Sequence, residues 1–306
     1  MTANDYFVRD RLTPKVKTAT EIRQALKQSF EQGETLSFIG VTQAIEAMIV
    51  ERQAAELNRP TGLYMSGAGL STSLGLPDIG VMSLDQLVYA VEAIASVTNL
   101  PLLVDIDTGY GDAALTMKRL EQAGATMIHI EDQLFPKRCG HLDGKDLVLT
   151  EEMCAKIKEA VEARDDKNFL IMARSDARAV ESFDGMMDRL KAYLDAGADT
   201  LFPEAMTSLD DFKQVKDTFP HTPLLANLTE NGKTPLGLET DLRALKYGVL
   251  LYPVTLIRTH MKYVEDKMKS LLKVGNASLE QDVMARQKCM SYLLYDDYVD
   301  QDNKNK

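Results

Sequence analysis

A single thiol stands among residues suited to proton transfer. Cys139 lies in the run K-R-C-G-H, after two cations, Lys137 and Arg138, and before a Gly-His pair. Neighbouring cations favour the thiolate form of a cysteine, and Gly140 and Gly144 give the backbone freedom to close over a ligand. The segment therefore predicts a mobile lid with a reactive tip. The plain alternative is a small, inert side chain in a loop.

Two neighbouring carboxylates predict a cation site. Asp105 and Asp107 are two residues apart in L-V-D-I-D, so on an extended strand their side chains point the same way. Two like charges side by side are unfavourable without a cation, and oxygen ligands suit Mg²⁺ that keeps several waters. The alternative is that these carboxylates only cap a loop or a helix. Further acids for such a site are Asp78, Glu131 and Asp132.

Other runs end in groups that can bind an anion or move a proton. Arg174 ends I-M-A-R and can hold a carboxylate bidentately, although it could instead pair with a nearby acid to hold the structure. Tyr64 and Ser66 end L-Y-M-S, where a phenol and a hydroxyl could meet a carboxylate or take a proton, although a tyrosine there is otherwise ordinary core. Asn227 and Thr229, in L-A-N-L-T-E, do not individually indicate a particular role.

The elements that must position these groups follow a βα pattern. Short apolar runs alternate with amphipathic segments of about fifteen residues, as expected around a parallel sheet. Eight such runs predict an α/β fold, a (β/α)8 TIM-type barrel; an open doubly wound sheet is the alternative. The predicted strands are 36–41, 62–66, 102–107, 127–131, 169–174, 200–203, 224–227 and 249–253.

Local signals support this arrangement. Gly124 and Gly197 mark helix ends, and the related runs A-G-A-T-M-I-H-I-E and A-G-A-D-T-L-F-P-E place Glu131 and Glu204 at strand ends. In a barrel, the carboxyl ends of the strands form the catalytic face, so the polar strand-end residues should be interpreted together. The expected helix caps are Ser83, Thr150, Ser182 and Ser208.

Composition limits the classes of function. The chain has 306 residues and a net charge of −11, which argues against nucleic acid and anionic membrane as partners. Three cysteines form no disulfide framework or zinc spacing, and no apolar run is long enough for a membrane span, so we expect a cytoplasmic protein. The expected segments are an N-terminal helical segment (1–34), the barrel (35–275) and a C-terminal helix and tail (276–306).

The motifs together resemble the isocitrate lyase and phosphoenolpyruvate mutase superfamily, and within it the 2-methylisocitrate lyases. The similarity runs from about Ser37 to about Tyr298, and K-R-C-G-H is its most specific element. Isocitrate lyases have a similar cysteine loop but are longer and carry a Ser-Pro-Ser stretch where this chain has Asn227-Leu228-Thr229. The quoted motifs are Y-M-S-G-A-G-L-S-T-S-L-G-L-P-D, L-V-D-I-D-T-G-Y-G, H-I-E-D-Q, M-A-R-S-D-A, F-P-E-A and L-A-N-L-T-E.

The resemblance implies cleavage of a small tricarboxylate, 2-methylisocitrate, to pyruvate and succinate in the methylcitrate cycle of propionate catabolism. It implies Mg²⁺, with Mn²⁺ as a second option, held by Asp105 and Asp107, with Asp78 and Glu131 reaching it through water. Cys139 would be the general acid, and Tyr64 would accept the hydroxyl proton. Substrate would be bound by Ser66, Gly67, Ala68, Gly140, Arg174, Glu204, Asn227, Leu228, Thr229, Arg258 and Arg286.

The resemblance also implies a helix-swapped homotetramer, although the apolar stripe of 279–300 could equally pack on its own barrel. Two departures stand out. The helix between Gly111 and Gly124 is about one turn shorter than in relatives, and Ser175 stands where threonine is common. Two other functions stay open. One is another lyase or a decarboxylase of the same superfamily, isocitrate lyase above all. The other is a non-catalytic organic-acid binder or interaction protein, which would have no use for Cys139.

Overall fold

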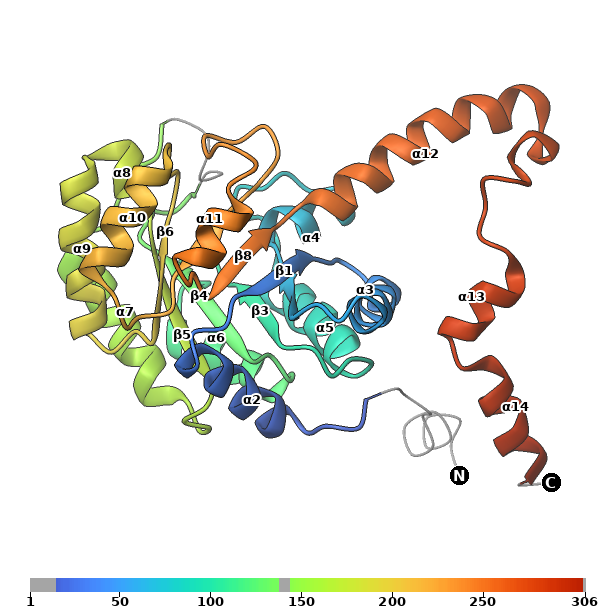
Figure 1. Ribbon diagram of the computed structural model, residues 1–306, viewed down its shortest axis with the longest axis horizontal. Coiled ribbons are helices and arrows are strands. Elements are labelled where there is room, and N and C mark those ends of the chain that lie inside the picture. Colours follow the sequence, from blue (N-terminus) through green and yellow to red (C-terminus); the bar gives the residue numbers. More distant parts are fainter. Residues whose placement is uncertain (1–14, 138–143, 305–306) are drawn as a thin grey trace.

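Eight parallel strands form the centre of the computed structural model, which describes residues 15–137 and 144–304 (Figure 1). All eight predicted strands are present, with ends that shift by one or two residues. The strands are β1 (Leu36–Gly40), β2 (Thr61–Met65), β3 (Leu102–Asp105), β4 (Met127–Glu131), β5 (Leu170–Ser175), β6 (Thr200–Pro203), β7 (Leu225–Asn227) and β8 (Val249–Tyr252).

The sheet closes on itself. Its order is β6-β5-β4-β3-β2-β1-β8-β7, and a parallel bridge between Leu201 and Leu224 joins the two outer strands. The Leu201 amide donates to the Pro223 carbonyl at 3.2 Å across the same gap. The predicted TIM-type barrel is therefore confirmed, and the open doubly wound sheet is excluded.

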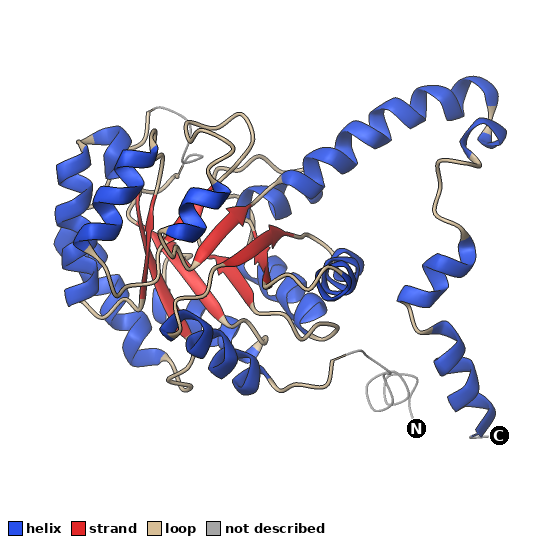
Figure 2. Ribbon diagram, viewed as in Figure 1, coloured by secondary structure: helices blue, strands red, loops and turns tan. Residues whose placement is uncertain are grey.

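Helices surround the strands, as the colouring by secondary structure shows (Figure 2). Helix α2 lies at the end of the barrel where the strands begin. The helices are α2 (Ala19–Glu31), α3 (Ala44–Glu56), α4 (Gly67–Ser73), α5 (Leu84–Ala95), α6 (Ala113–Gln122), α7 (Thr150–Ala163), α8 (Ala177–Val180), α9 (Phe183–Asp195), α10 (Leu209–Thr218), α11 (Glu239–Ala244), α12 (Thr255–Val274), the 3₁₀ turn η1 (Asn276–Leu279), α13 (Arg286–Tyr292) and α14 (Tyr295–Lys304).

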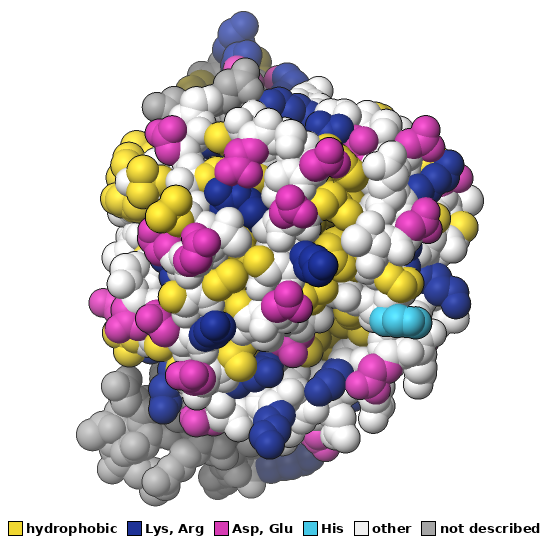
Figure 3. Space-filling model, turned by 90° about the vertical axis from the view of Figure 1, so that its left-hand side faces the viewer, with side chains coloured by type: hydrophobic (Ala, Val, Ile, Leu, Met, Phe, Trp, Pro, Cys, Tyr) yellow, Lys and Arg dark blue, Asp and Glu magenta, His cyan; other side chains and the backbone are white. Residues whose placement is uncertain are grey.

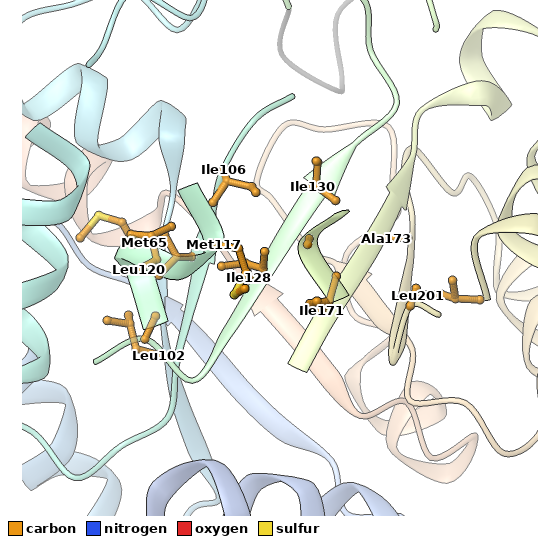
Figure 4. Close-up of a cluster of buried hydrophobic side chains, with 14 of the residues drawn as sticks. Met65, Leu102, Ile106, Met117, Leu120, Ile128, Ile130, Ile171, Ala173 and Leu201 are labelled. Carbon is orange, nitrogen blue, oxygen red and sulfur yellow. The ribbon is translucent and has the colours of Figure 1, made fainter. Parts of the chain in front are cut away.

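Side-chain alternation along the strands divides the core into two layers. Figure 4 shows part of the outer layer, where Met117 and Leu120 of α6 lie among strand residues that include Ile128. The inner layer fills the barrel and continues into α2 through Leu26 and Phe30. Burial of both strand faces explains why the strands read as continuous apolar runs.

Helix starts follow the sequence signals with one exception. Ser83, Ser182 and Ser208 each accept a hydrogen bond from a first-turn amide, as predicted. The prediction for Thr150 is wrong: Leu149 is the extended cap residue and Thr150 is already helical. The antiparallel bridge between Gln133 and Leu147 holds the preceding chain beside β4, so α7 begins without a side-chain cap.

The C-terminal region leaves the barrel. Helix α12 projects outward, and α13 and α14 lie on the α3 side (Figure 1). Arg52 of α3 donates to the Ser291 carbonyl at 2.8 Å and lies over the Tyr292 ring. The single C-terminal helix expected within 276–306 is divided into α13 and α14, and a non-helical stretch separates α13 from η1.

Two surface features bear on partners. Acidic and basic side chains are interspersed over the face shown in Figure 3, which lies on the α9 side of the barrel. Within the described residues, every helix is too short or too polar to cross a membrane.

Candidate active site

A small cavity of about 100 Å³ lies where the strands end, on the face predicted to be catalytic. It is lined by side chains from seven of the eight strands and the loops that follow them. They are Tyr64, Ser66, Ala68, Asp78, Asp105, Glu131, Lys137, Arg174, Phe202, Glu204, Asn227, Thr229, Leu251, Pro253 and Val254.

The two aspartates converge, but not for the reason expected. Asp105 is the last residue of β3, whereas Asp107 lies beyond the strand with φ of +47°. The Asp107 amide donates to Asp105 Oδ1 at 3.0 Å, so a tight turn places the second carboxylate beside the first. A Cβ added to Gly67 would lie 3.1 Å from oxygens of both acids, which explains the glycine there.

A lysine takes the position of a counter-ion. Lys137 Nζ lies 2.8 Å from Asp107 Oδ1 and also contacts Asp78, and its side chain is only 4% exposed. Burial and the Asp105 charge raise the pKa of Asp107 to about 7, although Lys137 opposes this shift. Burial would also raise the pKa of Asp105, but interactions with His129, Lys137 and Arg174 lower it to about 2.

The donor set fits a hard cation. Carboxylates of Asp78, Asp105 and Glu131 line the cavity, Asp107 lies beside Asp105, and such oxygens are the ligands that Mg²⁺ prefers. Among the described residues, no three acids, histidines or cysteines are already arranged around a common ion position. Lys137 lies between two of the acids, so binding of an ion there requires its ammonium group to move.

A histidine that the sequence analysis did not single out lies under Tyr64. His129 is fully buried in β4; its Nε2 is 2.9 Å from the Tyr64 hydroxyl and 3.5 Å from Asp105 Oδ1. Burial, opposed by the Asp105 charge, lowers the pKa of His129 to about 4, so the ring is neutral near pH 7. Burial and Asp105 raise the pKa of Tyr64 well above its usual value, so the phenol keeps its proton.

Arg174 is surrounded by acids. It donates to both oxygens of Asp176, from Nε at 2.9 Å and from Nη2 at 3.1 Å. Its Nη1 lies 3.1 Å from Glu131 and its Nη2 lies 3.5 Å from Glu204. The rim-pairing alternative for Arg174 is therefore present in the structure, together with exposure of the guanidinium to the cavity.

Asp176, the main partner of Arg174, is held by further buried contacts. Asp132 accepts hydrogen bonds from the Asp176 amide at 2.9 Å, from the Ser175 hydroxyl at 2.7 Å and from the Tyr193 hydroxyl at 2.8 Å. Lys145 Nζ lies 2.8 Å from Asp176 Oδ1. The hydroxyl of Ser175, which stands where threonine is common, is therefore hydrogen-bonded to the Asp132 carboxylate.

Polar groups on the opposite wall complete the cavity. Asn227 Nδ2 donates to Glu204 at 3.2 Å, and the Thr229 amide donates to Asn227 Oδ1 at 3.2 Å. Ser66 caps α4 by accepting from the Gly69 amide at 3.1 Å. Leu228 is buried in the outer core and does not line the cavity.

Two predicted arginines, Arg258 and Arg286, are not brought to the cavity. Cys139 and Gly140 lie outside the described residues. Arg258 is exposed one turn after Val254, and its Nη1 donates to the Glu230 carbonyl at 2.8 Å. Arg286 is exposed at the start of α13, away from the barrel mouth of its own chain (Figure 1).

Comparison with known proteins shows which family this chain belongs to. The model of the phosphoenolpyruvate phosphomutase family matches residues 26–272. The chain belongs to this family. A probable 2-methylisocitrate lyase 1 from Corynebacterium glutamicum is 42% identical over 90% of each chain. A 2-methylisocitrate lyase from Salmonella typhimurium is 38% identical over 92% of this chain and 97% of its own. The predicted resemblance is thus confirmed.

Solved structures of the family have the same barrel. A 2,3-dimethylmalate lyase, described as a member of the PEP mutase/isocitrate lyase superfamily, is 30% identical with a TM-score of 0.84, covering 95% of this chain and 96% of its own. A phosphonopyruvate hydrolase in complex with oxalate and Mg²⁺ is 27% identical with a TM-score of 0.77, covering 93% of this chain and 98% of its own. A divalent metal thus occurs with this fold in a relative.

Proposed function

We propose that the protein is a carbon–carbon lyase that cleaves 2-methylisocitrate to pyruvate and succinate, the lyase step of the methylcitrate cycle in propionate catabolism. The observation that carries this proposal is the cavity at the strand ends, which is lined by Asp105 and Arg174, with Asp107 beside Asp105. Relatives named 2-methylisocitrate lyase, 35–43% identical to this chain, support the choice of substrate.

The cation of the proposed enzyme is Mg²⁺, with Mn²⁺ as a second option. Asp105 and Asp107 would hold it, with Asp78 and Glu131 reaching it through water. Bound there, the ion would acidify the substrate hydroxyl and stabilise charge on the forming ketone. Displacement of Lys137 Nζ from Asp107 would free a ligand oxygen.

The chain's own groups divide the substrate between them. Ser66, Gly67 and Ala68 are proposed to bind the α-keto acid part, and Arg174 with Glu204 orients the molecule. Because a guanidinium binds a carboxylate in two parallel hydrogen bonds, Arg174 fixes both position and angle. The second carboxylate region is assigned to Gly140, Asn227, Leu228, Thr229, Arg258 and Arg286.

Tyr64 is proposed to take the proton of the substrate hydroxyl. Since its phenol is neutral, it can accept this proton only while it passes its own to another atom. His129 Nε2, at 2.9 Å, and Asp105, at 3.3 Å, are both placed to receive it. The carbon–carbon bond then breaks, leaving pyruvate and a succinate carbanion.

Cys139 is proposed to protonate that carbanion. Its thiol must carry a proton at this moment, although the neighbouring cations favour the thiolate. A reduced thiol is the form expected in the cytoplasm, which is the location we propose. A simple organic-acid binder would not need such a proton donor.

Product analysis tests the proposed substrate. Purified enzyme is incubated with Mg²⁺ and either 2-methylisocitrate or isocitrate, and pyruvate, glyoxylate and succinate are quantified. We expect pyruvate and succinate from the methylated substrate, with a higher kcat/KM than for isocitrate. Preferential glyoxylate release would instead identify an isocitrate lyase. The likeness to 2,3-dimethylmalate lyase makes dimethylmalate the third substrate to include.

We further propose that the enzyme is a helix-swapped homotetramer. In a (β/α)8 barrel the helix after β8 ordinarily packs beside β1, yet α12 projects away and leaves an apolar groove of about 560 Å³. Its lining includes Ile39, Val50 and Leu256. Helix α12 carries exposed apolar side chains, Met261, Val264, Met268 and Leu272, that could fill the same groove of a second copy.

A further inference from the structure

A buried lysine stands directly behind the substrate-binding arginine. The side chain of Lys145 is only 1% exposed, and its Nζ lies 2.8 Å from Oδ1 of the fully buried Asp176. We propose that Lys145 is a positioning residue that acts through Asp176 to keep Arg174 oriented and attractive to a substrate carboxylate. This inference rests on the proposed function, because it takes Arg174 as the carboxylate anchor.

The shared carboxylate provides the geometric argument. Asp176 Oδ1 meets both Lys145 Nζ, at 2.8 Å, and Arg174 Nη2, at 3.1 Å, while Oδ2 meets Arg174 Nε at 2.9 Å. The ammonium and the guanidinium therefore share one oxygen. Because Lys145 neutralises part of the charge on that oxygen, Asp176 attracts Arg174 less strongly and leaves the guanidinium available to the cavity.

Charge gives a second reason. Arg174 contacts Glu131, Asp176 and Glu204, so one cation faces three carboxyl groups. Lys145 adds a second cation beside Asp176. Without Lys145 the group would carry one more unit of uncompensated negative charge, which weakens the attraction of an incoming carboxylate in a site of low dielectric constant.

Lys145 is not needed merely to hold Asp176 in place. The Asp176 amide donates to Asp132 Oδ1 at 2.9 Å, and Asp132 is itself held by Ser175 and Tyr193. Buried ion pairs are also weak contributors to stability, since desolvation offsets much of their attraction. A buried lysine at this point is therefore better explained by its effect on Arg174.

Steady-state kinetics with 2-methylisocitrate test the proposal in three Lys145 variants of the full chain. Lys145→Met removes donor and charge, Lys145→Gln keeps a donor, and Lys145→Arg keeps both. We expect KM to rise about tenfold or more in the Met and Gln variants with kcat changed by less than about threefold, as for loss of charge-assisted binding. Lys145→Arg should recover most of the wild-type KM.

A matched control separates this effect from a general loss of stability. Arg164 pairs with Asp199 at 2.6 Å near the opposite end of β5. Arg164→Met should lower the melting temperature without changing KM. Unchanged KM in folded Lys145→Gln, or an equal KM rise in Arg164→Met, would overturn the inference.

Pyruvate binding distinguishes failure of this inference from failure of the proposed function. Calorimetric titration with pyruvate needs no turnover, and its Kd should weaken about tenfold in Lys145→Gln, in parallel with KM. If the wild type cleaves none of the tested substrates, the proposed function fails and this titration alone decides the inference. Equal pyruvate affinity in wild type and variant rejects it.

Discussion

At the scale of single residues, the site holds more acidic than basic side chains. Lys137 contacts Asp78 and Asp107, and Arg174 contacts Glu131, around a cavity of about 100 Å³ that Asp105 also lines. Burial raises the pKa of Glu131 well above its usual value, even though Arg174 opposes the shift. A divalent ion would relieve this excess of carboxylates, and binding of the substrate would bring further ligands.

The first prediction concerns Asp107. Asp107→Asn keeps the size of the side chain and removes a charge, so we expect kcat to fall roughly a hundredfold, the loss typical of one preorganised electrostatic contact. The Mg²⁺ concentration for half-maximal activity should rise. Asp85→Asn is the matched control, because Asp85 is exposed and pairs with Arg119 on the surface. Wild-type kinetics in Asp107→Asn would contradict the assignment.

The second prediction concerns the thiol. Cys139→Ser should lower kcat by roughly 10²-fold or more, the usual contribution of a general acid. Cys154→Ser should retain wild-type succinate formation, because Cys154 lies on α7 with its Sγ directed to the Ala192 carbonyl at 3.5 Å. Equal succinate yields from both variants would exclude Cys139 as the acid.

Residues whose side-chain type and position at a strand end indicate a chemical role were predicted from the sequence. Residues whose role depends on a partner far away in the sequence were missed. Asp105, Arg174 and Tyr64 were found from their place at strand ends. His129 is two residues before Glu131 on one strand, so alternation could have placed it on the same face. Lys145 had no such signal, because its partner Asp176 is 31 residues away and only the folded barrel joins them.

At the scale of elements, the sequence pattern predicted the helices and strands correctly wherever local interactions determine where an element begins and ends. All eight strands and three of four serine or threonine caps were predicted correctly. The Thr150 cap was wrong because a tertiary contact, the bridge between Gln133 and Leu147, sets where the chain enters α7. The break before α13 was missed because the apolar spacing continues through residues that are not helical.

The third prediction uses this contrast between caps. Ser83 forms a capping box with Gln86, so Ser83→Ala should lower the free energy of unfolding by about 1 kcal/mol. Thr150→Ala should change it by less than about 0.5 kcal/mol, because Thr150 caps nothing. Chemical denaturation of both variants measures the difference. A larger loss in Thr150→Ala would show that the cap assignment is reversed.

At the scale of the whole molecule, a closed barrel presents one catalytic face, while the C-terminal region extends outside it. Closure follows from the contact between β6 and β7, which no local pattern can reveal. The position of α12 was likewise beyond sequence reasoning, since an apolar helical stripe fits its own barrel and a partner's equally well.

The fourth prediction concerns assembly. A chain that ends at residue 274 lacks α13, α14 and Arg286 but keeps α12. We expect it to bind substrate more weakly, with KM raised about tenfold by loss of one anion-binding arginine, while it still associates through α12. Substitution of Met268 by Asp should instead disrupt association. Light scattering after size-exclusion chromatography measures both, and a monomeric wild type would contradict the helix-swapped assembly.

The most direct test of the central claim, that carboxylates at the strand ends support metal-assisted carbon–carbon cleavage, is pyruvate release from 2-methylisocitrate before and after metal removal. We expect release to stop in the presence of a chelator and to return in full when excess Mg²⁺ is added. Undiminished pyruvate release from the fully chelated enzyme would contradict the account.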